Sequence, residues 1–323
     1  MRNRLAYLLI ALAGCEGFIR HQAAGTTAQI LELAQPSLQQ ESDYELASRA
    51  IPGALKTIEG FYVADAQPVL RHILSEGYCQ YATAFVEDEW EVAKFAKQID
   101  QVEYHNTRAS KMFARCMNYA LDDMPGDFEK VLFGPPDIAI KHINDIGLSR
   151  RTELMWVGAG LGGMVNHNLT SAEMLSYIPI VKAILARVIA IDTAQRGVID
   201  GTKQVPCDAS CTVHLALPHI ATGMLNSAAS AQFGGDAKKA AEEFQIALRI
   251  TADAKHPEGR MLLARVLWGY RVGLMTNDEK LFHEQLVKVL ETDPGIWPEQ
   301  RLANEVAQRR ARRYLSHEKE LFH

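Results

Sequence analysis

Most long segments of the chain place their hydrophobic residues at the three- to four-residue spacing of an amphipathic helix. In residues 236–254, Ala240, Phe244 and Leu248 fall on one side, while charged residues occupy the other. Asp236 follows two glycines and stands where a helix N-cap belongs. Residues 278–294 repeat this arrangement. Alternating strand patterns with turn dipeptides are scarce, so the sequence predicts an all-α fold.

Three of these predicted helices end in related turns, each containing or followed by an aspartate. The turns AIDT, RITA and ETDP resemble the closing turn of a tetratricopeptide helix pair. Such pairs repeat every 34 residues or so and stack into a solenoid. Asp192, Asp253 and Asp293 are separated by 61 and 40 residues, so any repeats are degenerate. We therefore expect a tetratricopeptide-like helical array of the α-solenoid kind.

The first fifteen residues have the order of a secretory signal. Arg2 and Arg4 precede an apolar run, and small residues come directly before Cys15. The run is shorter than the roughly 20 residues that a membrane span needs. Leu12-Ala13-Gly14-Cys15 looks like a bacterial lipobox, in which a peptidase cuts before the cysteine and the cysteine carries the lipid. Cys15 is therefore the expected lipid attachment site.

This signal defines the expected division and location of the chain. The divisions are a signal peptide over residues 1–14, a lipid-anchored segment over residues 15–40, and a single all-α domain over residues 41–323. Glu16 follows the cysteine, and a residue other than aspartate there goes with sorting to the outer membrane. We expect a periplasmic protein tethered to that membrane by lipid, with no other membrane span.

Composition and charge exclude several function classes. The chain has 34 basic and 39 acidic residues, a net charge of −5 and no long basic tract, so no nucleic-acid partner is expected. The dense arginine cluster at residues 309–313 and the acidic run at residues 87–89 are interpreted as solvated helix faces. No Ser-His-Asp order or HExxH motif stands out. No catalytic residue, metal or cofactor is predicted.

The segment VGAGLGGM, residues 157–164, fits the dinucleotide-binding pattern GxGxxG. Such a site needs a strand before the glycines, a helix after them and an acid about 20 residues on. The acid available is Asp192, 29 residues beyond Gly163. We favour one buried helix whose glycines let neighbouring helices approach, although each interior glycine costs about 1 kcal/mol against alanine. A nicotinamide-dependent oxidoreductase is the distant alternative.

The cysteines other than Cys15 permit disulfides outside the cytoplasm. Cys207 and Cys211 would close a small loop and are the first candidates. With His214 they also match a zinc spacing, but an oxidising compartment favours the disulfide. Cys79 and Cys116 lie in helical, apolar settings and are expected to be buried hydrophobes.

Two segments resemble a known family. Residues 51–89, with ALKTIE and QYATAFV, and residues 301–322, with QRRAR, resemble the T component of tripartite ATP-independent periplasmic (TRAP) transporters. Between them, residues 154–166 and the apolar helix that follows have the family's order. The resemblance spans almost all of the chain after the signal. The sequence departs from the family at residues 201–219, which are longer and richer in cysteine and histidine, and in the glycine run.

The resemblance implies a lipid-anchored periplasmic protein that works without catalysis. It implies a homotrimer in which each protomer encloses a mostly apolar pore. It also implies association with the transporter's solute-binding subunit, and binding or passage of a hydrophobic or amphipathic small ligand. The alternative is a tetratricopeptide-like envelope scaffold that binds other proteins through a concave groove.

A pore helix should be apolar all round with small residues on one side. The candidate pore-lining residues are Met155, Trp156, Gly160 and Met164, with Tyr81 and Phe85, one helical turn apart, as a second wall. The alternative for each is an ordinary core side chain. In the pore interpretation, replacing Gly160 with leucine would block ligand uptake.

Overall fold

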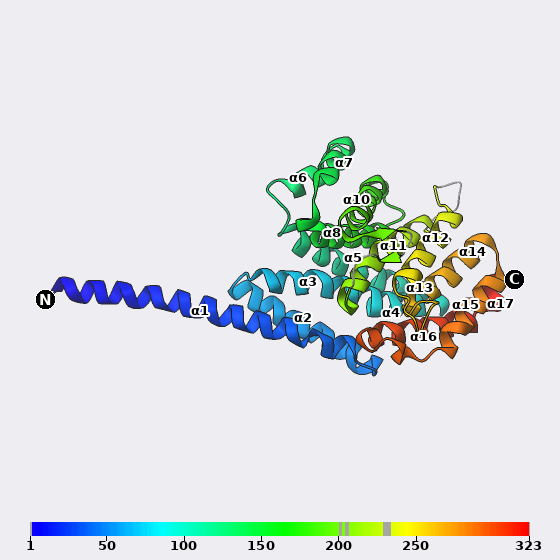
Figure 1. Cartoon of the computed structure of the whole chain (residues 1–323), viewed down its shortest axis with the longest axis horizontal. Coiled ribbons are helices and arrows are strands. Elements are labelled where there is room, and N and C mark those ends of the chain that lie inside the picture. The colour runs from blue at the N-terminus through cyan, green and yellow to red at the C-terminus, as the bar shows by residue number, and fades with distance from the viewer. Residues whose placement is uncertain (1, 200–201, 204–206, 229–233, 323) are drawn as a thin grey trace.

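A computed structural model of the protein describes residues 2–199, 202–203, 207–228 and 234–322, without the side chains of residues 2–20, 195–196, 198–199 and 202–203. Nearly all of these residues are helical (Figure 1). The strand structure within them is one antiparallel pairing of β1 (Val198–Ile199) with β2 (Thr202–Lys203). The predicted all-α fold class is confirmed.

The first half of the chain builds the left and upper parts of Figure 1. Helix α1 (Arg2–Gln39) projects from the other helices and places the N-terminus at the far end of the long axis. The helices that follow are α2 (Tyr44–Ala64), α3 (Pro68–Tyr81), the π-helix η1 (Ala82–Val86), α4 (Glu87–Phe95), α5 (Ile99–Leu121), α6 (Phe128–Leu132), α7 (Pro136–Asp145), the 3₁₀ turn η2 (Leu148–Arg150) and α8 (Arg151–Asn166). The backbone stays helical from α3 through η1 into α4, so these three elements form one continuous path.

The second half completes the bundle and brings its penultimate helix back to α2 and α4. Its helices are α9 (Ala172–Ser176), α10 (Ile178–Arg196), α11 (Ala209–Asn226), α12 (Ala237–Ile250), α13 (Leu262–Leu267), the π-helix η4 (Trp268–Val272), α14 (Gly273–Thr276), α15 (Glu279–Glu291), the 3₁₀ turns η5 (Pro294–Ile296) and η6 (Pro298–Gln300), α16 (Arg301–Ser316) and α17 (Glu318–Phe322). The side chains of Asp236 and Asp278 cap α12 and α15, which confirms the predicted starts of both helices.

The buried hydrophobic residues form one large cluster and two smaller ones. The large cluster lies among α2, α3, α5, α7, α8 and α10. The smaller clusters lie around α11, α12 and α13, and around α13, α15 and α16. The stretch Ala172–Ala194 is long and apolar enough to cross a membrane by length and composition. One face of it, including Ile184 and Val188, is buried against α8 and α7.

The glycine run lies inside a single helix, α8, so the helical interpretation is confirmed and the dinucleotide loop is wrong. The glycines allow α8 to approach helices on two sides. A Cβ atom at Gly160 would lie 2.8 Å from the backbone of α5, at both Met117 N and Phe113 O. A Cβ atom at Gly158 would lie 2.5 Å from Ile184 Cγ2 on α10. Two neighbours therefore pack closer to α8 than any side chain there would permit.

Alanine at two positions of this run is expected to have different effects on stability. Gly160→Ala must displace the backbone of α5, and overpacking of this kind costs about 1–3 kcal/mol. Gly162→Ala would meet Val181 Cγ1 at 3.3 Å, and the cost of this tight contact should offset about 1 kcal/mol of gained helix propensity. The free energy of unfolding from urea titration should therefore fall in the first variant and stay near wild type in the second. Equal effects would contradict close packing of α8 on α5.

The structure contains two disulfides in its described part. Cys207 and Cys211 are joined at the start of α11, with their Cα atoms 5.5 Å apart. Cys79 on α3 and Cys116 on α5 are also joined, with Cα atoms 5.3 Å apart. The prediction that Cys79 and Cys116 would be free thiols is wrong, because they form a disulfide. Both are buried, as expected. Their helices pack face to face, which brings two apolar positions within disulfide reach.

Candidate functional site

A cavity of about 1050 Å³ lies among α1, α2, α3, η1, α8, α10, α11, α13 and α16. Its wall is mainly aliphatic, with side chains such as Leu55, Ile220, Met224 and Leu267. Small-molecule sites are mostly apolar and usually occupy about 300–1,000 Å³. This cavity therefore has the lining of a ligand site and the size for a large apolar molecule.

The structure places the predicted pore residues in two different settings. Those in the cavity wall are Tyr81, Phe85, Met155 and Trp156. Gly160 faces α5, as described above, and Met164 packs half-buried against the large hydrophobic cluster. The small residues of α8 that line the cavity are Gly158, Ala159, Gly162 and Gly163. The sequence indicated the correct helix but not which side of α8 faces the cavity, because a glycine-rich helix has no clear polar face.

Several residues of the cavity wall are exposed to solvent. Ala34 and Ser37 belong to α1. Leu169 and Leu175, near α9, are 46% and 38% exposed. The wall thus includes solvent-exposed residues from segments that are far apart in the chain.

Four polar residues line the cavity from one continuous helical path. Glu76 and Gln80 on α3, Thr83 on η1 and Glu87 on α4 are spaced by four, three and four residues. This spacing puts them on one side of a helix. We call these four residues the polar stripe. Sequence reasoning missed it, although the same spacing within an apolar segment was readable as a signal.

Each carboxylate of the polar stripe has a histidine beside it. Glu76 Oε1 accepts a hydrogen bond of 2.7 Å from Gln80 Nε2, and Glu76 Oε2 lies 3.4 Å from His214 Nε2 without hydrogen-bond geometry. Glu87 Oε1 lies 3.0 Å from a nitrogen of the fully buried His167. Burial raises the pKa of both carboxyl groups, but their neighbours outweigh it and hold each pKa below its usual value. His214 contributes most at Glu76, and His167 followed by Arg310 at Glu87. The polar stripe therefore carries two carboxylates.

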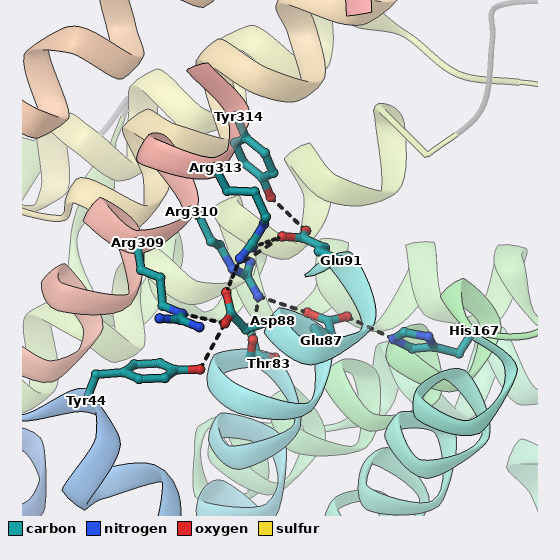
Figure 2. A network of polar contacts seen from close by, with 10 residues as sticks. All are labelled: Tyr44, Thr83, Glu87, Asp88, Glu91, His167, Arg309, Arg310, Arg313 and Tyr314. Atoms are coloured by element: carbon teal, nitrogen blue, oxygen red, sulfur yellow. Dashed lines mark hydrogen bonds and ion pairs between the residues drawn. The ribbon is translucent and has the colours of Figure 1, made fainter. Parts of the chain in front are cut away.

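Next to the polar stripe, α16 is held to α4 by a network of ion pairs (Figure 2). Asp88, 1% exposed, accepts hydrogen bonds from Arg309, Arg313 and the Tyr44 hydroxyl. Arg313 and Tyr314 also bind Glu91.

Arg310 is the member of this cluster that reaches the cavity, and it is 2% exposed. Its Nη2 donates to the Thr83 carbonyl at 2.5 Å and lies 3.7 Å from Glu87. The prediction of a solvated face is therefore wrong for Arg310 and Arg313. It is also wrong for Glu87 and Asp88. The partners of these four side chains lie on helices that are distant in the sequence. Only Arg312 of the cluster is exposed without an acidic partner among the described residues.

The two segments that suggested a family meet across this network. Thr83, Glu87 and Asp88 belong to residues 51–89, and the arginines belong to residues 301–322. A family model of the TRAP transporter T component matches residues 40–198 and 215–322. The chain belongs to the TRAP transporter T-component family. The family is one of transporter accessory subunits and is not a known enzyme family.

The family match omits residues 199–214 of this T component. That gap overlaps the departure noted in residues 201–219 and contains Cys207 and Cys211. A search of curated proteins finds no match to the chain. The part of the structure that holds the cavity and the ion-pair network lies mainly within the family's two matched segments.

Proposed function

We propose that this T component is a lipid-anchored periplasmic accessory subunit that binds or passes a hydrophobic or amphipathic small ligand. The observation that carries the proposal is the apolar cavity of about 1050 Å³. Solvent-exposed residues of the cavity wall come from more than one element, which suits a pore better than a closed pocket. Membership of the T-component family supplies the link to a TRAP transporter.

The sequence and the disulfides support the proposed location. The lipobox order ending at Cys15 supports a signal peptide over residues 1–14 and lipid attachment to the periplasmic face of the outer membrane. Cys15 lies within α1, in the part whose side chains the structure does not describe. The Cys79–Cys116 disulfide fits an oxidising compartment such as the periplasm.

The proposal includes an assembly. Family resemblance supports a homotrimer and association with the solute-binding subunit of the transporter. It also supports a tetratricopeptide-like arrangement of the helices after the anchored segment 15–40, as one domain over residues 41–323. The rival function, a scaffold that grips extended peptides, predicts peptide binding with no small ligand in the cavity.

Native mass spectrometry of the protein purified from its own periplasm tests the proposal, with Cys15→Ser to keep it soluble. We expect a trimer that carries extra mass, released on denaturation as a lipophilic compound. Ala159→Phe places a ring in the cavity and should lower ligand affinity about tenfold or more, which is about 1.4 kcal/mol. Ala186→Phe, at an exposed position of α10 outside the cavity wall, is the matched control. A protein without adduct that binds extended peptides would instead support the scaffold.

A further inference from the structure

The polar stripe offers hydrogen bonds at its centre and has charges at its ends. Gln80 is exposed although it belongs to the cavity wall, and its amide nitrogen donates to Glu76. Within the described chain, the Gln80 amide oxygen and the Thr83 hydroxyl have no hydrogen-bond partner. These two groups are neutral and can both accept from a ligand, and the hydroxyl can also donate.

The carboxylates at the two ends of the polar stripe already have charged or polar partners within the protein. Glu76 lies beside His214 of α11, and Glu87 lies between His167, directly after α8, and Arg310 of α16. Arg310 is in turn surrounded by the acids of the ion-pair network and bonded to the Thr83 carbonyl. A ligand carboxylate placed along the polar stripe would therefore meet two existing carboxylates, since the cation beside the stripe, Arg310, is already paired. The lysine of the cavity wall, Lys182, belongs to α10 and not to the stripe or its partners.

The polar stripe is long as well as narrow. Glu76 and Glu87 are eleven positions apart, so at about 1.5 Å per helical residue the polar stripe is roughly 16 Å long. The other walls of the cavity are mainly apolar, with Leu217 and Ile220 of α11, Leu267 of α13 and Val306 of α16. A few polar residues, such as Gln35, Asn166 and Lys182, also belong to them. A plain hydrocarbon tail lying along the polar stripe would leave the Gln80 amide oxygen and the Thr83 hydroxyl against apolar atoms without hydrogen bonds, which costs free energy.

We propose that the cavity selects an uncharged facial amphiphile, a rigid apolar skeleton with several hydroxyl groups along one edge. Hydroxyl groups satisfy Gln80 and Thr83, because each hydroxyl both donates and accepts. They also donate to the carboxylates at the ends of the polar stripe, while the opposite face of the skeleton contacts the aliphatic walls. This inference rests on the proposed function, since it names the ligand class of the same cavity.

Equilibrium dialysis of the Cys15→Ser protein tests the ligand class with two probes of similar size. One is a bile alcohol, an uncharged sterol whose hydroxyl groups lie along one face, and the other is cholesterol. We expect the bile alcohol to bind at least about tenfold more tightly. The double variant Gln80→Leu with Thr83→Val should lose that preference and keep or increase its affinity for cholesterol.

Matched controls separate the polar stripe from general effects of the substitutions. Gln101→Leu and Thr57→Val make the same changes at exposed positions of α5 and α2 outside the cavity wall, and both should keep the wild-type preference. If cholesterol binds as tightly as the bile alcohol, or the double variant weakens both probes equally, the inference is overturned while the apolar cavity stands. If neither probe nor any co-purified lipophile binds, the proposed function itself fails.

Discussion

Replacing Asp88 with alanine is expected to lower the free energy of unfolding by about 3–5 kcal/mol, because removing one partner of a buried ion pair leaves the others uncompensated. Asp88 is 1% exposed and bonds Tyr44, Arg309 and Arg313. Without it, α16 loses its main attachment to α4 and α2. Urea titration followed by circular dichroism measures the loss.

Two further variants make this expectation specific. Asp88→Asn keeps the shape and part of the hydrogen bonding, so its loss should be smaller. Asp145→Ala, at an exposed position at the end of α7, should stay within about 0.5 kcal/mol of wild type. If Asp88→Ala is as stable as Asp145→Ala, the network contributes nothing net to the fold.

The same carboxyl group makes stability depend on pH in a defined direction. Burial raises the pKa of Asp88, but Arg313 and Arg309 outweigh it and hold the pKa below its ordinary value of 3.8. The unfolded chain therefore binds protons more readily than the folded one in acid. The stabilisation is complete above about pH 5 and is lost as the pH falls through the folded pKa. The Asp88→Asn variant should show a shallower loss over this acidic range than the wild type.

Removing the Cys79–Cys116 disulfide is the second change with a large expected effect. The bonded cysteines are 37 residues apart, and closing a loop of that length stabilises a fold by about 4 kcal/mol in the chain-entropy model. The double variant Cys79→Ala with Cys116→Ala should lose about that much in a guanidinium titration. Both positions are buried, so alanine adds no unpaired polar group.

The second disulfide provides the matched comparison. Cys207 and Cys211 are four residues apart. In the chain-entropy model, closing a loop of that length stabilises the fold by about 2 kcal/mol. Cys207→Ala with Cys211→Ala should therefore cost about half as much. Equal losses in the two double variants would show that loop length does not govern the stabilisation.

Local features of the fold were predictable because their causes are local. Helical periodicity and capping aspartates depend on residues within a turn or two, so α12 and α15 were located correctly. The glycine run was recognised as one helix for the same reason. Gly160 was nevertheless assigned to the pore, because the direction of a residue around a helix without a polar face depends on which neighbours pack there.

Charged and polar clusters were misread because their partners are distant in the chain. Arg313 and Asp88 are 225 residues apart, and each, seen alone on its own helix, has the pattern of a solvated face. A charge can be buried only when an opposite charge and hydrogen-bond partners are brought to it. The Cys79–Cys116 disulfide likewise depends on how α3 packs on α5.

The sequence by itself determined the helices, their caps and, through residues 51–89 and 301–322, the T-component family. Those properties follow from short-range periodicity and from ordered patterns along the chain. Tertiary structure alone decided that the two segments meet in one buried network, and that α3, η1 and α4 turn a polar stripe toward an apolar cavity. Burial and pairing are properties of contacts between helices, and no local pattern specifies which helices come together.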